Sequence, residues 1–406
     1  MLFLAVLIAA IAVFFIQKRL FAASVDERIK YSICFSSFEV YEKTEFFMYE
    51  TIVNDSISSL PDLKVTTTLD DGLKICYYDI VRSGHRDSYV DRKRSSLVSI
   101  FTMKPKLKIE RRRRIYAEKR GIYSIDDVMM TVRDITGLYK NTFRYDLPVN
   151  SDNTVAVLPV PIELDRFFAS TLWQNGSVSV VHSLLSDPLD IAGIREYTEN
   201  DPLSKINWKA TARTSRLMVN NEEHTEKKRF NIILNIQSRE HEIPGKEPEA
   251  LNYIELGIKI CASLFDLIGP ENSPVRFFTN APHIPDYCDE LPELEEAPTE
   301  SRDFIGRGDT VNALRMLAEL KNYITCEFSS VLDHAGDSDR GCGTNVIVSS
   351  YINDTMIAFA EKMRSKKVRT VFFLTSLVRS VSEIPPGIEV FYRLHTAPEG
   401  KGGDIS

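Results

Sequence analysis

The chain has 406 residues, of which 43% are hydrophobic and 10% aromatic, and its net charge is −7. This composition suffices for packed cores and excludes wholesale disorder, and the negative charge argues against a general nucleic-acid binder. The length suits two domains with a shorter segment left over. None of the cysteines forms a CxxC pair, which indicates free thiols in a reducing compartment rather than a zinc site or a disulfide framework. The six are Cys34, Cys76, Cys261, Cys288, Cys326 and Cys342.

The amino-terminal segment is apolar throughout residues 1–16 and is closed by Gln17, Lys18 and Arg19. We expect a transmembrane anchor over residues 1–22. The alternatives are a buried core helix and a cleaved signal peptide, and the latter would need positive charge before the apolar run. The positive charges follow the run instead. The positive-inside bias therefore predicts a single-pass protein of the cell membrane with most of the chain in the cytoplasm.

Residues 23–168 are expected to form an antiparallel β-sandwich. Short β-rich runs such as 46–53, 64–69 and 97–103 are separated by Asn-Asp, Asp-Gly and Ser-Gly turn signals. Residues 103–110 alternate between lysine and apolar side chains, which predicts a strand, and Pro105 restricts that strand to an edge or a bulge. The spacing of the turn signals predicts about six to eight strands.

Three polar segments are candidate surfaces. The basic cluster, residues 104–120, suits either protection of an edge strand or contact with anionic lipid headgroups. The acidic stretch, residues 286–303, is expected to be a long loop that leans towards disorder. Residues 332–345 collect Asp333, His334, Asp337, Asp339 and Cys342, but their glycines favour a solvated loop over a metal site.

The second half of the sequence changes character. Apolar runs at 230–236, 275–278, 345–352 and 368–374 show no alternation, as expected of parallel strands that are buried on both faces. Apolar residues between them recur at helical spacing, as in the stripe of Ile254, Ile258 and Cys261. Strands that alternate with helices predict an open, mostly parallel α/β sheet over residues 229–406.

The linking segment, residues 169–228, contains the most distinctive stretch of the chain, residues 195–218. Ile206 and Trp208 are two residues apart, so in an extended segment they would share one face and pack into the second domain. We expect this motif to brace the two domains, with a binding surface as the alternative. Catalysis is not expected, because no nucleophile and base are spaced to act together. The motif residues are Tyr197, Asp201, Lys205, Ile206, Trp208, Lys209, Ala212 and Arg213.

This motif resembles the hallmark of the bacterial membrane-anchored "domain of unknown function 58" family. Residues 120–139 and 157–161 resemble two further runs of that family. The resemblance implies a von Willebrand factor A-like domain over residues 229–406. It also implies a membrane-anchored, non-catalytic scaffold or adaptor that works with a MoxR-type AAA+ ATPase in the assembly or maturation of an unknown client complex. The alternative function is a hydrolase or nuclease with its site at the carboxyl ends of the parallel strands, where open α/β sheets place ligands.

The A-like resemblance also raises the question of a metal. A-type domains that bind Mg²⁺ place carboxylate and hydroxyl ligands after the first strand and add a threonine and an acid from later loops. The matching positions here are Asn235, Gln237, Arg239 and Thr310, with Ser349 or Ser350 in place of the last acid. An arginine and the missing carboxylates do not suit a hard cation. We therefore expect a degenerate site, with no metal, no cofactor and no nucleic-acid partner.

Overall fold

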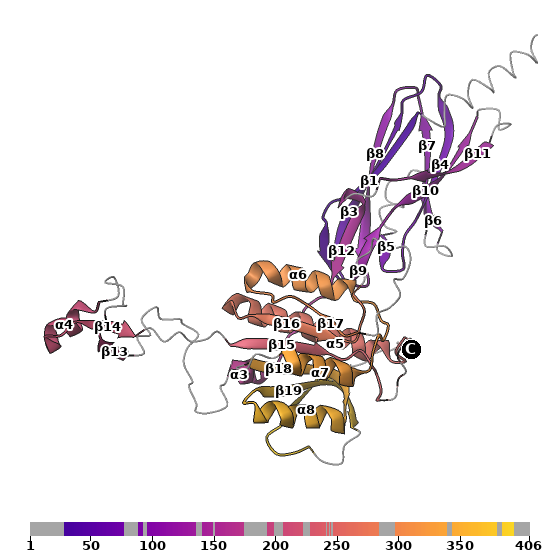
Figure 1. Ribbon diagram of the computed structural model, residues 1–406. Helices are drawn as coiled ribbons and strands as arrows, with labels where there is room; N and C mark the ends of the chain where they lie inside the picture. The colour runs from indigo at the N-terminus through magenta and orange to yellow at the C-terminus, as the bar shows by residue number, and fades with distance from the viewer. Residues whose placement is uncertain are drawn as a thin grey trace, which may run out of the picture.

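The computed structural model describes residues 28–76, 88–91, 96–134, 140–148, 151–173, 193–198, 206–221, 228–240, 242, 244, 247–283, 297–338, 343–379 and 384–393. Within these ranges the chain forms a β-sandwich, an α/β unit below it and a small unit made of two strands and a helix (Figure 1).

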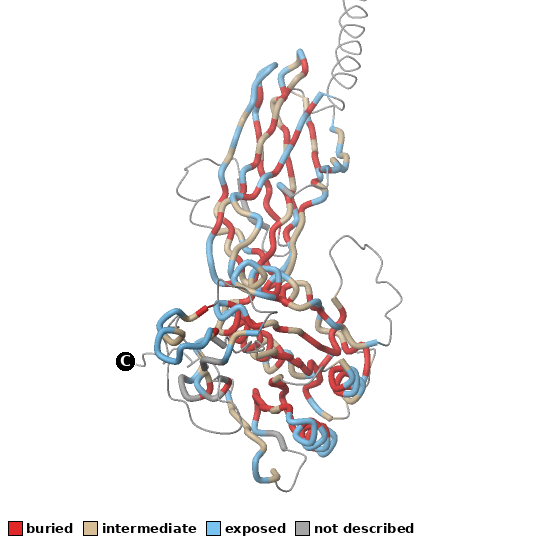
Figure 2. The backbone as a smooth tube through the Cα atoms, turned by 60° about the vertical axis from the view of Figure 1, so that its left-hand side comes forward, coloured by how far each residue is buried: buried red, intermediate tan, exposed pale blue. Residues whose placement is uncertain are grey.

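The sandwich consists of two antiparallel sheets whose inner faces share one apolar core. Alternation of apolar and polar residues places every second side chain inside, as in β1, where buried and exposed residues alternate strictly (Figure 2). The first sheet has the order β1-β3-β8-β5, with β1 (Ile29–Phe35), β3 (Glu45–Asn54), β8 (Lys108–Ala117) and β5 (Leu73–Ile75). The second has the order β11-β10-β4-β7-β6, with β11 (Lys140–Asp146), β10 (Asp127–Arg133), β4 (Leu60–Thr68), β7 (Ser96–Met103) and β6 (Ser88–Asp91).

A third, small sheet closes the base of the sandwich. It has the order β2-β12-β9, with β2 (Glu39–Tyr41), β12 (Thr154–Leu158) and β9 (Gly121–Ser124), and the short helix η1 (Ser151–Asn153) precedes β12. Val155 and Val157 of β12 pack into the sandwich core, whereas Ala156 and Leu158 pack into the core of the α/β unit. Strand β12 therefore belongs to both units.

The α/β unit is built on a six-stranded sheet of order β17-β16-β15-β18-β19-β20. Only the β16–β17 pair is antiparallel. In β15, Phe230 and Ile232 face one helical layer and Ile233 faces the other, so both faces of the sheet are buried. The strands are β15 (Arg229–Leu234), β16 (Val275–Thr279), β17 (Thr299–Glu300), β18 (Gly343–Ile352), β19 (Arg369–Arg379) and β20 (Glu389–Tyr392).

Helices cover both faces of this sheet (Figure 1). One layer contains α3 (Arg166–Trp173), α5 (Leu251–Ile268) and α6 (Gly306–Glu319), with the short helix η3 (Gly269–Glu271) after α5. The other layer contains α7 (Phe328–Ser338) and α8 (Asp354–Ser365). The small unit contains β13 (Gly193–Glu196), α4 (Trp208–Thr214) and β14 (Met218–Asn221).

Two parts of the expected architecture are contradicted. The anchor predicted over residues 1–22 lies outside the described residues, and none of the helices within the described ranges has the length and apolar character needed to span a membrane. The predicted single-pass membrane location is corrected accordingly. The chain is predominantly β-sheet with antiparallel, sandwich-like sheets, and the von Willebrand factor A-like fold class is corrected as well. Unbroken apolar strands specify burial on both faces, but they do not specify a fold family.

Two local expectations also fail, and a third stays a prediction. Residues 103–110 are not one strand, because β7 ends at Met103 and a turn with Lys106 at a φ of 58° leads into β8. Strand β8 pairs with β3 along Lys108–Tyr116, whereas β5 pairs only with Ile115–Ala117, so protection of an edge by the basic cluster stays a prediction. Residues 332–338 are not a loop but part of helix α7, because Val331, Leu332 and Ala335 form a buried stripe.

The arginines of the basic cluster are engaged within the sandwich. The guanidinium of Arg111 lies 4.0 Å from the ring centroid of Phe101, and that of Arg112 lies 4.4 Å from the ring centroid of Phe47. Arg113 is buried. These contacts give the run of arginines a role in packing, since stacked guanidinium groups cover apolar rings while they retain their charge.

Candidate functional site

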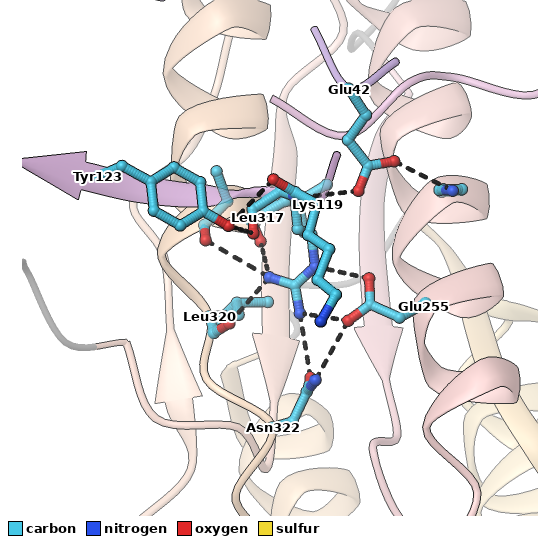
Figure 3. Close-up of polar contacts among 10 residues, drawn as sticks. Glu42, Lys119, Tyr123, Glu255, Leu317, Leu320 and Asn322 are labelled. Atoms are coloured by element: carbon cyan, nitrogen blue, oxygen red, sulfur yellow. Dashed lines mark hydrogen bonds and ion pairs between the residues drawn. The ribbon is translucent and has the colours of Figure 1, made fainter. Parts of the chain in front are cut away.

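The junction between the sandwich and the α/β unit is organised around Arg120, which follows β8 (Figure 3). Its guanidinium forms a two-pronged ion pair with Glu255 of α5, with Nε–Oε2 at 2.9 Å and Nη2–Oε1 at 3.1 Å. Nη1 donates to the carbonyl oxygens of Leu317 and Leu320, each at 2.8 Å, and Nη2 donates to Oδ1 of Asn322 at 3.0 Å. The arginine thus ties the sandwich to α5 and to the end of α6.

Arg120 is suited to this place because its planar guanidinium presents several donors in a fixed geometry. The side chain is only 5% exposed, and an unpaired charge at such a position would be very unfavourable. Burial by itself raises the pKa of Glu255, but the charge and hydrogen bonds of Arg120 and the hydrogen bond from Asn322 outweigh it. The pKa of Glu255 consequently lies below its ordinary value of 4.5, so the pair is ionised at neutral pH.

Further contacts hold the same junction. Glu42 accepts a hydrogen bond from the backbone N–H of Arg120 at 2.8 Å, and its other carboxylate oxygen lies 3.0 Å from Nζ of Lys259 in α5. The backbone N–H of Ile162, after β12, donates to Oγ of Ser263 in α5 at 2.7 Å. With the shared strand β12, these contacts fix the two units relative to each other.

This role of Arg120 could not be predicted from the sequence. Arg120 was grouped with a basic surface cluster, because neither a partner 135 residues away nor the depth of the side chain is visible in a local pattern. One local signal was available. Gly121 adopts a φ of 151°, and a Cβ there would lie 2.9 Å from the ring of Tyr123. The Arg-Gly-Ile-Tyr run therefore marks a special backbone conformation.

The motif residues lie in the small unit of β13, α4 and β14, and Asp201 and Lys205 lie outside the described residues. Tyr197 donates its backbone N–H to the carbonyl of Leu217 at 2.8 Å. Ile206 is buried and forms a bridge with Val219. Trp208 begins helix α4, for which Oδ1 of Asn207 accepts a capping hydrogen bond from the N–H of Ala210 at 3.0 Å.

The predicted brace is wrong for Trp208. Its side chain is 68% exposed, and α4 has no buried residue. Because the chain turns into a helix at Trp208, Ile206 and Trp208 do not share a face as they would in an extended segment. Lys209, Ala212 and Arg213 are exposed on the same helix. The motif forms a surface, and the two large units are braced by Arg120 rather than by Trp208.

The positions compared with a metal site lie in two separate places. Oδ1 of Asn235 accepts from the N–H of Gln237 at 3.0 Å and from Nδ2 of Asn280 at 3.2 Å, and its Nδ2 donates to Oγ of Ser349 at 3.1 Å. Thr310 instead lies against Gly269 of η3, near the amino end of β16. Arg239 is exposed and pairs with Glu249 at 2.8 Å. The absence of a metal and a cofactor stays a prediction.

A cavity of about 410 Å³ opens beside the Asn235 network at the carboxyl edge of the sheet. Its apolar wall comes from α7 and α8, and its polar wall carries Glu240, Glu242 and Glu327. Burial of the phenol, opposed by a hydrogen bond with Asn235 and reinforced by these three carboxylates, raises the pKa of Tyr351 to about 12. The Ser238 hydroxyl donates to Glu242. However, the Glu242 carboxylate also accepts from the backbone N–H groups of Ser238 and Glu249, so it closes a loop rather than serving as a free base.

Comparisons with known proteins identify no family. No family profile matches the sequence, and no curated protein matches it. Among solved structures, the chain is similar over 33% of its length to Escherichia coli alpha-2-macroglobulin, with 9% identity, 24% of that chain covered and a TM-score of 0.25. It is similar over 33% to the CARDB domain of a Pyrococcus furiosus protein, with 14% identity, 94% of that chain covered and a TM-score of 0.19. It is similar over 31% to the collagen-binding domain of a Staphylococcus aureus adhesin, with 8% identity, 96% covered and a TM-score of 0.22.

The matching region spans about a quarter of the alpha-2-macroglobulin chain. At such TM-scores and identities the likenesses support no conclusion about activity, substrate or partner.

Proposed function

We propose that this protein is a non-catalytic adaptor, akin to the "domain of unknown function 58" family, that presents a client complex to a MoxR-type AAA+ ATPase. The partner class comes from the resemblance of the motif at residues 195–218. The observation that supports the proposal is the exposure of Trp208, which is 68% exposed, because tryptophan is enriched among the residues that anchor protein interfaces.

The surroundings of Trp208 fit a protein-binding surface. Leu217 is 43% exposed, and Lys209, Arg213 and Arg216 add positive charge around the two apolar side chains. Arg216 is paired with Glu196 at 2.6 Å, which leaves Lys209 and Arg213 as the charges directed at a partner. An exposed aromatic side chain flanked by cations favours a partner with an apolar pocket rimmed by carboxylates.

The small unit is itself suited to docking. Strand β13 pairs only with β14 among the described strands, and α4 has seven residues, none of them buried. A helix this short gains little stability from its own hydrogen bonds. We therefore expect a partner to order this unit further when it binds.

The test compares capture and stability for Trp208→Ala. We expect unchanged thermal unfolding and a loss of ATPase capture, since truncation of an anchoring tryptophan costs about 2 kcal/mol or more of binding free energy. The chain is used as bait in cell lysate, and captured ATPase is quantified by mass spectrometry. Phe38→Ala is the matched control, because Phe38 is 56% exposed and lies in the sandwich.

The outcomes separate the alternatives. Equal capture by the wild type and Trp208→Ala would overturn the proposal, as would equal losses with Trp208→Ala and Phe38→Ala. A fall of several degrees in the melting temperature of Trp208→Ala would instead place the indole in a packed core.

A further inference from the structure

A second cavity, of about 530 Å³, lies at the opposite, amino edge of the α/β sheet, between α8 and the chain before β20. Its walls carry Arg364, Lys367 and Thr370, together with the ion pair between Arg369 and Glu389. The volume lies in the range of small-molecule sites, about 300–1,000 Å³. Neither the resemblance nor the proposed adaptor role assigns anything to this cavity.

The floor of the cavity contains a hydrogen-bonding group without a partner. Thr370 lines the cavity and is 9% exposed, and its Oγ1 is buried with no hydrogen bond. Along β19, Phe372 and Leu374 belong to the core under α7 and α8, whereas Val371 and Phe373 belong to the other core. By alternation, Thr370 lies on the α8 face of the sheet, which is the face of the cavity.

A second unsatisfied group lies beside it. Asn345 of β18 is the register partner of Thr370, is fully buried, and has no partner for its Nδ2. Its Oδ1 is occupied, because it accepts from Nδ2 of Asn231 at 2.9 Å. A buried group of this kind costs free energy unless a water or a ligand satisfies it, so two neighbouring examples mark a site.

The unmet groups are all able to donate. Asn345 offers an amide N–H, Thr370 a hydroxyl, and Arg364 and Lys367 offer cationic donors that form no ion pair within the described residues. The lining carries three cations and two carboxylates, Glu361 and Glu389, and Glu389 is neutralised by Arg369. The group that satisfies such a set is an acceptor with negative charge.

The cavity is also prepared for such a ligand by its backbone. Near the end of α8, the carbonyl groups of Met363 and Arg364 accept hydrogen bonds from the N–H groups of Lys366, Lys367 and Val368, so these two carbonyls do not repel an anion as free carbonyls would. Arg364 donates to the carbonyl of Pro386 at 3.3 Å, and a Cβ on Gly387 would lie 3.0 Å from its Nη1. Gly387, at a φ of 97°, therefore allows the chain to lie against the guanidinium and orient it.

We propose that this cavity binds a small organic oxyanion, a phosphate ester or a carboxylate, with Arg364 and Lys367 holding the charge and Thr370 donating a hydrogen bond from the floor. The proposal is independent of the adaptor role.

The test titrates inorganic phosphate and, separately, acetate into the full chain, with sodium chloride of equal ionic strength as the reference. Binding is followed by calorimetry and by the shift in melting temperature. We expect one of the two anions to bind and to raise the melting temperature above the chloride reference. A stronger effect of phosphate identifies a phosphoryl ligand, and a stronger effect of acetate identifies a carboxylate ligand.

Two matched pairs of variants locate the site. Arg364→Gln should weaken binding about tenfold or more, since it removes a charged donor, whereas Lys362→Gln removes a cation from the same helix outside the cavity. Thr370→Val should weaken binding several-fold, whereas Thr344→Val removes an equally buried, unpartnered hydroxyl from the opposite face of the sheet. No binding of either anion to the wild type would overturn the proposal. Full affinity in Arg364→Gln or in Thr370→Val would overturn it as well.

Discussion

Arg120 of the sandwich and Glu255 of helix α5 form a two-pronged ion pair across the junction of the two large units. Each donor nitrogen of the arginine has an acceptor, and the acceptors come from two segments of the α/β unit, helix α5 and residues 317–322 at the end of α6. The relative orientation of the units is thus set by a polar contact of defined geometry, in addition to apolar packing.

Arg120→Ala should lower the free energy of unfolding by about 3 kcal/mol, the lower end of the cost of breaking a buried ion pair, because Glu255 is one-third exposed. Chemical denaturation, followed separately in each unit, should also show that the unfolding transitions of the sandwich and of the α/β unit occur at more different denaturant concentrations in the variant than in the wild type. Arg133→Ala is the control, since the Arg133–Asp62 pair is exposed and its loss should cost less than about 1 kcal/mol. Similar losses in both variants would contradict a special role for Arg120.

The same ion pair predicts that the free energy of unfolding depends on pH. The folded pKa of Glu255 is lower than its unfolded value of 4.5, so its contribution to stability is present above that value and is lost as the pH falls through the folded value. The stability difference between the wild type and Arg120→Gln should therefore be constant from about pH 6 to pH 8 and shrink between about pH 5 and pH 3. Urea denaturation at each pH measures this difference. A difference that grows on acidification would reverse the sign and refute the assignment.

The placement of Thr310 can be tested with two glycines. A Cβ on Gly269 would lie 2.2 Å from Oγ1 of Thr310, whereas a Cβ on Gly308 in α6 would meet nothing within 4 Å. Gly269→Ala should cost about 1–3 kcal/mol through overpacking, and Thr310→Ala in the same chain should restore part of it. Gly308→Ala should stabilise by about 0.4–1 kcal/mol. Thermal unfolding of the variants measures these changes in stability, and an unchanged melting temperature in Gly269→Ala would argue against the contact with Thr310.

Some of the secondary structure could be predicted because the signal is local. The apolar runs at 230–236 and 345–352 coincide with β15 and β18, since branched apolar residues buried on both faces leave an unbroken pattern. Helix α5 follows from the spacing of Ile254, Ile258 and Cys261, all of which are buried. In these places the spacing of apolar residues in the sequence matches the repeat of the strand or helix that forms.

The predictions that failed concern residues whose surroundings cannot be read from the neighbouring sequence. Trp208 was expected to pack between the domains because an extended segment would place it on one face with Ile206, but the chain forms a short helix at Trp208 that leaves the indole exposed. Thr310 was grouped with Asn235 by resemblance, although helix α6 begins at the other edge of the sheet. Arg120 was assigned to a surface, because the acceptors that bury it come from residues 255–322. None of these partners is visible from a local window of sequence.

The alternating side chains of β12 affect how the molecule responds to mechanical load. A tensile force applied to the sandwich reaches the α/β unit through this five-residue strand as well as through the Arg120–Glu255 contact. Val155 and Val157 anchor the strand in the sandwich core, and Ala156 and Leu158 anchor it in the core of the α/β unit. Because the strand has no stretch of backbone that is free of both cores, bending at the junction would require side chains to leave one of them.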